Sequence, residues 1–159
     1  MLIQVCSQAR ALTLAAEAQE KTAILSITST GDEEVAFPKN VYIDSILHLK
    51  VNDLVSAYDE EGFPYGRPLP EPGDFEGLKA FVSSLRCERL IVHCWEGTSR
   101  SAAVAKAIYE SRGCRDQLLP GPRFDPNPLI YDLARQALTQ TPHINPKAAR
   151  NGPFPGGRP

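Results

Sequence analysis

The stretch IVHCWEGTSRSAAVAKA at residues 91–107 decides the fold that we expect for this chain. It starts as an apolar strand, turns through the polar segment HCWEGTSRS at 93–101 and continues as an alanine-rich helix. Strands that feed directly into helices build parallel α/β sheets. The turn therefore lies at the carboxyl end of a strand, where such sheets usually bind ligands.

Strand and helix patterns alternate along the rest of the chain. Ser7 is placed to cap one helix, Asp74 is placed to cap another, and Gly113 follows the end of a third. We expect strands at 2–6, 22–28, 41–51 and 89–94, and helices at 9–20, 75–86, 99–112 and 126–138. This alternation predicts an α/β fold with a single domain, in which a mostly parallel central sheet is flanked by helices.

Two segments show no such period. Residues 55–73 hold four prolines and three glycines, which predicts a long loop of the kind that often carries function. Residues 140–159 are rich in proline and glycine and poor in apolar residues, so we expect a disordered tail there. The predicted domain accordingly covers residues 1–139.

The composition excludes several classes of partner. The formal net charge is -2 and the pI is about 5.9, so we expect no nucleic-acid binding and no membrane binding. Every apolar stretch is far shorter than the ~18–20 residues of a membrane-spanning helix. The four cysteines form no CxxC pair and show no zinc-ligand spacing with the three histidines, so we expect no metal. Free thiols are typical of a cytoplasmic protein, which is the location that we expect.

The polar turn has the features of an anion site built around a thiolate. Backbone N–H groups in such a turn converge on one point, and the helix dipole adds positive potential. The residues that would surround a bound phosphate are Trp95, Glu96, Gly97, Thr98, Ser99 and Arg100. The same setting favours the thiolate of Cys94, which makes it the candidate nucleophile. Arg100 can hold two phosphate oxygens with its planar guanidinium.

The neighbours of the nucleophile suggest supporting roles. We expect Gly97 to supply a positive φ or a close backbone approach, at a place where a Cβ would obstruct the phosphate. The Ser101 hydroxyl can donate to the Cys94 sulfur, and the His93 ring is expected to hydrogen-bond backbone around the turn rather than act as a base. Trp95 suits stacking on a substrate and plain packing equally well.

These residues resemble a known family. HCWEGTSRS is similar to the phosphate-binding loop HCxxGxxR[ST] of cysteine-dependent protein tyrosine and dual-specificity phosphatases, with every fixed position matched. Over roughly 20–138 the chain also resembles small bacterial predicted tyrosine phosphatases, including Pro126 and Asn127 before the last helix. The resemblance implies a tyrosine-phosphatase-like fold and hydrolysis of phosphate monoesters through a cysteinyl-phosphate. It also implies that no cofactor is needed and that the substrate is a phosphorylated protein or a small phosphoester.

The resemblance further implies a general acid, taken from an aspartate on a loop upstream of the cysteine. Asp53 in LKVND follows an apolar strand, as the acid of that family does, and is our expected acid. The interval from Asp53 to Cys94 is 41 residues, which is long for the family, and the loop at 55–73 accounts for the excess as an insertion. That insertion keeps other carboxylates in contention, namely Asp59, Glu60, Glu61 and Asp74.

Other interpretations stay open. If the insertion holds every acid away from the turn, the chain could be a non-catalytic phosphate-binding module, a pseudophosphatase. Sulfurtransferases and arsenate reductases also place a cysteine in an anion-binding loop. Glu96 makes the lip of the turn acidic, which disfavours highly charged substrates. The other cysteines are expected to be buried apolar residues, with a thiol that resolves oxidised Cys94 as the alternative.

Overall fold

A parallel β-sheet forms the centre of the computed structural model, which describes residues 1–139. The tail predicted at 140–159 lies outside the described residues. The strands are β1 (Leu2–Ser7), β2 (Thr22–Thr28), β3 (Ile43–Lys50), β4 (Arg89–Cys94) and β5 (Gln117–Leu119). The helices are α1 (Gln8–Ala16), η1 (Pro72–Phe75), α2 (Leu78–Ser84), α3 (Arg100–Ser111) and α4 (Pro128–Thr139), where η1 is a short 3-10 helix.

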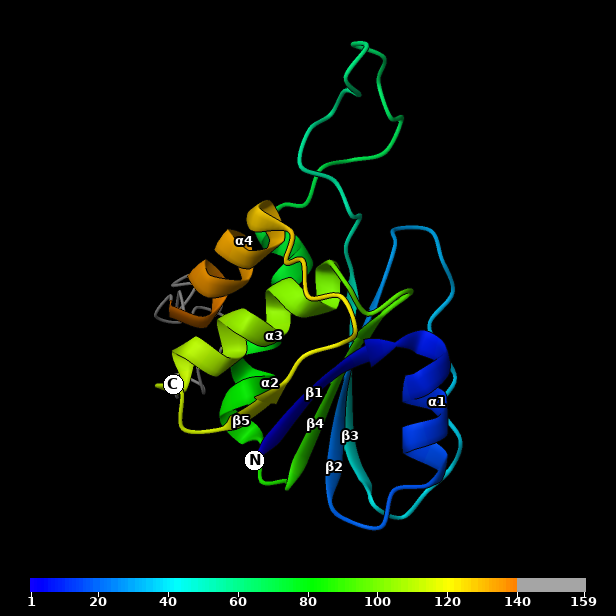
Figure 1. Cartoon of the computed structure of the whole chain (residues 1–159), viewed down its shortest axis with the longest axis vertical. Helices are drawn as coiled ribbons and strands as arrows, with labels where there is room; N and C mark the ends of the chain where they lie inside the picture. The colour runs from blue at the N-terminus through cyan, green and yellow to red at the C-terminus, as the bar shows by residue number, and fades with distance from the viewer. Residues whose placement is uncertain (140–159) are drawn as a thin grey trace, which may run out of the picture.

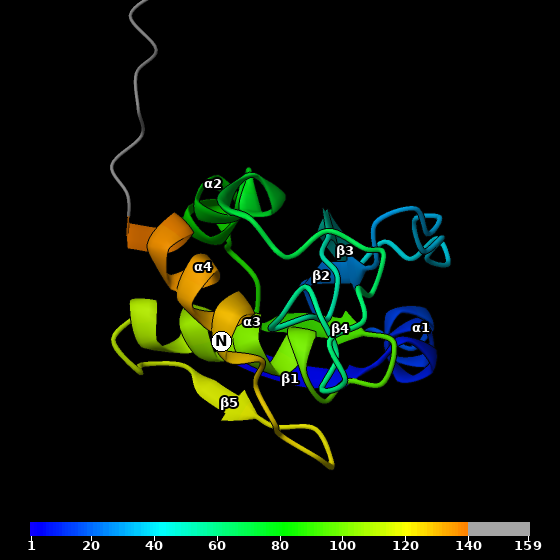
Figure 2. The same cartoon turned by 90° about the horizontal axis from the view of Figure 1, so that it is seen from above.

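All strand pairs in the sheet are parallel, in the order β3-β2-β4-β1-β5. Helix α1 covers one face, while α2, α3 and α4 cover the other (Figures 1 and 2). The predicted α/β class is therefore confirmed. Because β4 is the middle strand, the turn that follows it lies at the centre of the carboxyl edge of the sheet.

Burial explains why these segments form the sheet. All seven residues of β2 are buried, and so are five of the six residues of β4. Neither strand alternates between buried and exposed residues, which is the pattern of strands covered on both faces. In α3 the small side chains of the AA and AKA stretches let the helix approach the sheet closely, and the four buried alanines are Ala102, Ala103, Ala105 and Ala107.

Several predicted boundaries and caps can now be compared with the structure. Ser7 caps α1, since its Oγ accepts a hydrogen bond from the Arg10 N–H at 3.3 Å. Asp74 does not cap a helix that starts at 75, so that prediction was wrong. It belongs to η1, and α2 begins only after Gly77, whose φ of +81° interrupts the helical path. The three-residue strand β5 was not predicted.

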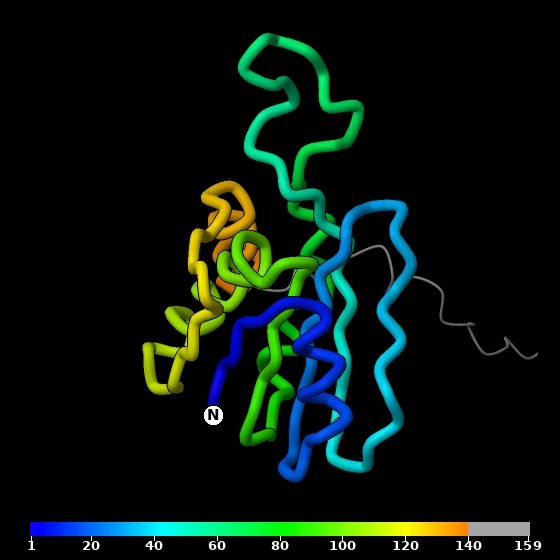
Figure 3. Tube along the Cα trace, turned by 45° about the vertical axis from the view of Figure 1, so that its right-hand side comes forward, coloured from blue at the N-terminus to red at the C-terminus, as the bar shows by residue number. Residues whose placement is uncertain are grey.

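The long loop is drawn out into an arm beyond the carboxyl edge of the sheet (Figures 1 and 3). We call residues 55–66 the arm. Tyr58 and Pro64 form an isolated antiparallel bridge across it, so the arm has a hairpin-like path. Within residues 1–139, no helix is long and apolar enough to span a membrane.

Candidate active site

The turn after β4 is fixed by backbone hydrogen bonds to the segments around it. We call residues 94–100 the cysteine loop. The Gln8 N–H, at the start of α1, donates to the Trp95 carbonyl at 3.2 Å. The Asp125 N–H donates to the Thr98 carbonyl at 3.0 Å. These two bonds tie the cysteine loop to the start of α1 and to the segment before α4.

Cys94 is the last residue of β4 and is buried. Its Sγ accepts a hydrogen bond from the Gly97 N–H at 3.3 Å and lies 3.2 Å from the Ser101 Oγ, in the first turn of α3. The predicted contact between Ser101 and the sulfur is therefore present. Since α3 starts at Arg100, the positive end of its dipole is directed at the loop. The Gly97 N–H and the positive potential at the start of α3 therefore both face the Cys94 sulfur.

Arg100 closes the loop with its side chain held in place. One terminal nitrogen donates to the Ser29 Oγ at 3.0 Å and to the Val51 carbonyl at 3.1 Å. The Nε is buried and has no hydrogen-bond partner among residues 1–139. A buried charged donor without a partner costs free energy, and an anion bound in the loop would supply the missing acceptor.

Asp53 lies across from Arg100 and is anchored through one oxygen. Its Oδ1 accepts hydrogen bonds from the Ser99 Oγ at 2.7 Å and the Asn127 Nδ2 at 3.0 Å. Its Oδ2 lies 3.9 Å from the Arg100 Nε, which is too far for a hydrogen bond. The structure thus brings Asp53 to the cysteine loop despite the 41-residue interval, with Oδ1 held by Ser99 and Asn127 and Oδ2 on the side of Arg100.

Asn127 ties this carboxylate to the start of α4. Its Nδ2 also reaches the Leu54 carbonyl at 3.3 Å, while its Oδ1 accepts the Ile130 N–H at 3.1 Å in the manner of a helix cap. Asn127 is 6% exposed, so it is fixed by packing as well as by these bonds. It therefore acts as a positioning residue for Asp53.

Gly97 has the predicted positive φ, at +79°, but the predicted steric reason was wrong. A Cβ on Gly97 would lie 2.3 Å from the carbonyl carbon of Cys6 and 2.5 Å from the Ser7 nitrogen, which are backbone atoms of β1. It would strike the sheet rather than a phosphate. A Cβ on Gly121 would in turn lie 2.7 Å from the Gly97 oxygen. The backbone at Gly97 therefore packs directly between the backbone of β1 and that of Gly121.

The predicted hydrogen bond from the His93 ring to loop backbone is not formed at normal geometry, and only a weak interaction with the Cys94 backbone is present. Both ring nitrogens are buried and neither has a hydrogen-bond partner among the described residues. The ring packs edge-on against Phe37 with 5.5 Å between ring centroids. Because successive strand residues point to opposite faces, His93 points away from the face where Cys94 meets α3. Burial lowers the pKa of His93 to about 4, so the ring is neutral at physiological pH.

The outward residues of the loop form its lip. Trp95 is 69% exposed, so the packing interpretation of its side chain was wrong. With the surface of α1 it lines a shallow groove, whose other residues are Gln8, Ala9 and Leu12. Glu96 is also exposed, which makes the lip acidic as predicted.

The alternative acids lie elsewhere. Asp59, Glu60 and Glu61 belong to the arm, which rises away from the loop (Figure 3). The Asp74 carboxylate accepts the Glu71 N–H at 3.0 Å within η1. Among the acids in contention, Asp53 is the one with hydrogen bonds into the cysteine loop.

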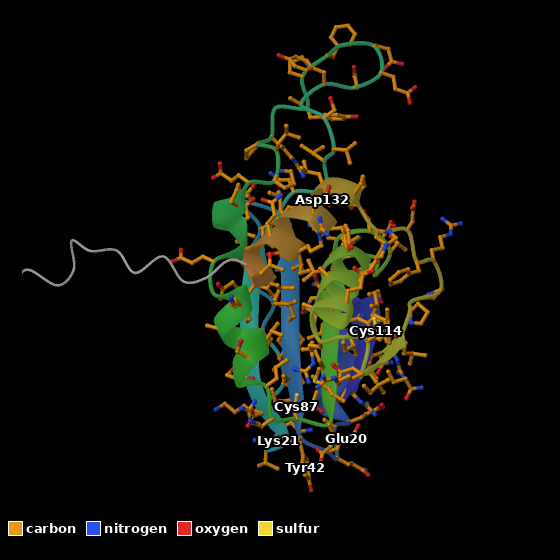
Figure 4. All side chains as sticks on the ribbon, turned by 90° about the vertical axis from the view of Figure 1, so that its left-hand side faces the viewer. Glu20, Lys21, Tyr42, Cys87, Cys114 and Asp132 are labelled. Atoms are coloured by element: carbon orange, nitrogen blue, oxygen red, sulfur yellow. The ribbon has the colours of Figure 1, made fainter. Side chains whose placement is uncertain are left out.

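The remaining cysteines are free, and the expectation that they are buried is confirmed for Cys6 but wrong for Cys114, which is exposed, while Cys87 is partly buried. Cys87 precedes β4 at the opposite end of the sheet from the arm, and Cys114 lies beyond the end of α3 (Figure 4). Cys6 is buried against α1, and burial raises the pKa of its thiol to about 12. That thiol is protonated at neutral pH, which makes it a poor partner for oxidised Cys94.

Sequence reasoning missed two groups that hold the arginine and did not foresee the Asn127–Asp53 link. Ser29 and the Val51 carbonyl, which bind Arg100, follow β2 and β3. The rule that ligand sites form at the carboxyl ends of parallel strands was the signal that could have pointed to these positions.

Known protein families and curated proteins offer no relative for comparison, since no family model and no curated sequence matches the chain. Residues 1–139 contain no group of three or more His, Cys, Asp or Glu side chains that could hold a metal ion. The loop presents a buried thiol before a helix N-terminus, a cation whose Nε has no hydrogen-bond partner among the described residues, and a carboxyl group on the facing side. Such a set can bind a tetrahedral anion and transfer its central atom to sulfur.

Proposed function

We propose that the chain is a phosphate monoester hydrolase, and by resemblance a protein tyrosine phosphatase, that acts through a cysteinyl-phosphate. The observation that carries this proposal is that the Gly97 N–H and the Ser101 hydroxyl contact the Cys94 Sγ, while the buried Arg100 Nε, which has no hydrogen-bond partner among residues 1–139, faces Asp53 at 3.9 Å. A thiolate nucleophile, an anion clamp and a proton donor are what this reaction requires.

In the first displacement, the Cys94 thiolate attacks phosphorus in line with the leaving oxygen. The sulfur–phosphorus bond forms as the bond from phosphorus to the ester oxygen breaks. Arg100 and the N–H groups of the cysteine loop stabilise the charge on the three equatorial oxygens. Asp53 donates its proton to the leaving oxygen from Oδ2, because Oδ1 already accepts from Ser99 and Asn127.

In the second displacement, water releases the phosphate. The Asp53 carboxylate takes a proton from a water molecule, whose oxygen attacks phosphorus as the sulfur–phosphorus bond breaks. The Ser101 hydroxyl, 3.2 Å from Sγ, stabilises the departing thiolate. Inorganic phosphate leaves, and both Cys94 and Asp53 return to the states in which they began.

The preference for phosphotyrosine rests on depth as well as on the resemblance. Cys94 is 2% exposed, so its sulfur lies below the surface and a substrate phosphate must reach it there. A phosphotyrosine side chain reaches further than phosphoserine and presents an aromatic ring to the lip.

Hydrolysis of p-nitrophenyl phosphate in the presence of EDTA tests the proposal. Wild type is expected to release p-nitrophenol and Cys94→Ser to release none, while Cys114→Ser, which changes an exposed cysteine beyond α3, retains full activity. Circular dichroism of each variant checks that the fold is kept. An inactive wild type that still binds phosphate would show a phosphate-binding module instead, and activity that survives in Cys94→Ser would exclude the cysteine mechanism.

A further inference from the structure

The arm carries an unusual share of exposed apolar surface. Among the described residues, ten large hydrophobic side chains are exposed, and four of them lie within the twelve residues 55–66. These four are Val55 (62% exposed), Tyr58 (58%), Phe63 (68%) and Tyr65 (50%). Clusters of exposed aromatic residues mark interaction surfaces, because leaving them in water forfeits the free energy of burial.

The arm is held in shape by its own hydrogen bonds. The Tyr65 N–H donates to the Ala57 carbonyl at 3.1 Å, and the Asp59 N–H donates to the Phe63 carbonyl at 2.9 Å. The Asp59 Oδ1 in turn accepts the Phe63 N–H at 2.7 Å. The aromatic side chains are thus presented on an ordered backbone, which lowers the entropy lost when a partner binds.

The charge of the arm selects the kind of partner. Its acids are Asp59, Glu60 and Glu61, and the segment between Lys50 and Arg67 contains no basic residue. The arm would therefore repel nucleic acid, and it would repel a second arm of the same charge. It complements a partner segment with lysine or arginine beside apolar side chains.

The arm stands at the catalytic end of the molecule. It begins two residues after Asp53 and extends beyond the carboxyl edge of the sheet, the edge that carries the cysteine loop (Figures 1 and 3). A partner bound to the arm is therefore beside the site, without occupying it.

We propose that the arm docks protein substrates through a basic segment that carries aromatic or aliphatic side chains and lies outside the phosphorylated residue. The identification of the partner as a protein substrate rests on the proposed function. The docking itself rests on the arm alone and can be measured without turnover.

The test uses the full chain and two arm variants. Tyr58→Ser/Phe63→Ser removes aromatic surface but keeps the backbone bonds of the arm, and Glu60→Lys/Glu61→Lys reverses charge while leaving Asp59 in place. Val41→Ser/Tyr42→Ser is the matched control. It removes side chains that are 94% and 45% exposed, and Tyr42 lies at the end of the sheet opposite to the arm (Figure 4).

Two readouts separate docking from catalysis. Fluorescence anisotropy measures binding of an unphosphorylated peptide rich in lysine and leucine, beside a peptide with glutamate in place of lysine. The kcat/KM is measured for p-nitrophenyl phosphate and for a phosphotyrosine peptide linked to the basic segment. Wild type and the control variant are expected to bind the basic peptide at least about tenfold more tightly than either arm variant, the effect of an interface hot spot. Added salt weakens this binding. All four proteins should hydrolyse p-nitrophenyl phosphate equally.

The possible negative results lead to different conclusions. Arm variants that bind and dephosphorylate the basic peptide as well as wild type does would overturn the docking proposal. If wild type fails to hydrolyse p-nitrophenyl phosphate but still binds the basic peptide through the arm, the proposed function fails and the docking surface stands. A change from dimer to monomer in the arm variants, measured by sedimentation velocity, would assign the arm to self-association and overturn the proposal.

Discussion

Substituting Gly97 by alanine should disable the cysteine loop through backbone geometry alone. Gly97 has a φ of +79°, and its Cβ would lie 2.3 Å from the Cys6 carbonyl carbon and 2.5 Å from the Ser7 nitrogen. These are atoms of a central strand in the sheet, so they cannot rotate away as a side-chain end can. The loop itself must therefore shift.

The size of the effect follows from two contributions. A left-handed conformation costs an alanine about 1–2 kcal/mol. A contact at 2.3 Å is more than an ångström inside the ordinary carbon–carbon separation of about 3.5 Å, and overpacking of this kind costs about 1–3 kcal/mol. Gly97→Ala should thus lower the free energy of unfolding by about 2–5 kcal/mol. A shift of about 1 Å in the loop should lower kcat/KM by about a hundredfold.

Gly113→Ala separates the two contributions. Gly113 also has a positive φ, at +69°, but the nearest atom to its added Cβ is the Arg115 Nε at 3.8 Å. This variant should lose about 1–2 kcal/mol and no activity. Urea unfolding followed by circular dichroism gives the free energies, and p-nitrophenyl phosphate hydrolysis gives kcat/KM. If Gly97→Ala matched Gly113→Ala in both, the stacking of the loop on β1 would have no energetic consequence and the reasoning would be refuted.

Three further predictions concern neighbouring residues. Asn127→Ala should lower kcat by about tenfold or more and cost about 1 kcal/mol of stability, because it removes both the bond to Asp53 and the cap of α4. Asn127→Asp keeps the cap acceptor but places a second carboxylate against Asp53 at a buried position, so it should lose the activity and be at least as unstable as Asn127→Ala. Full activity of both variants in kinetic assays would exclude a positioning role. The buried His93, with its pKa lowered from 6.5 to about 4, predicts that stability is insensitive to this group above pH 6.5 and falls as the pH drops from 6.5 to 4, since the unfolded chain takes up a proton that the folded chain refuses. The slope of the unfolding free energy against pH should reach about 1.4 kcal/mol per pH unit. In His93→Asn this slope should be smaller by about the same amount between pH 4 and pH 6.5. Identical slopes for the two proteins in urea titrations would contradict the assignment. Trp95→Ala should raise KM for aryl phosphates several-fold, because it removes an aromatic ring from the lip. It should lower the free energy of unfolding by less than about 0.5 kcal/mol, because the side chain is 69% exposed. An unchanged KM would show that Trp95 does not face the substrate.

Most of the fold was predictable from local sequence patterns. The run from strand to turn to helix at 91–107 is visible because its pattern lies within one short segment. β5 has three residues and gains its identity from pairing with β1, so no local period reveals it. The exclusion of Asp74 from α2 depends on the left-handed conformation of Gly77, which composition does not specify.

In the candidate site, too, contacts within one short segment were predictable from the sequence, and contacts between distant segments were not. Cys94, Gly97, Arg100 and Ser101 are close in sequence, and their mutual placement follows from one loop. The anchoring of Asp53 joins positions 53, 99 and 127, and the holding of Arg100 joins positions 29, 51 and 100. These contacts arise from packing between distant elements. His93 was misassigned because its role depends on which face of β4 it occupies.

Direct detection of the covalent intermediate tests the central claim. Wild type and Asp53→Asn are quenched in acid during turnover of p-nitrophenyl phosphate, and peptides are mapped by mass spectrometry. p-Nitrophenol leaves readily without a proton, so Asp53→Asn should still form the intermediate but hydrolyse it slowly. The cysteinyl-phosphate mechanism predicts a phosphoryl group on Cys94, more abundant in Asp53→Asn than in wild type. Phosphate release with no phosphoryl group on Cys94 in either protein would contradict it.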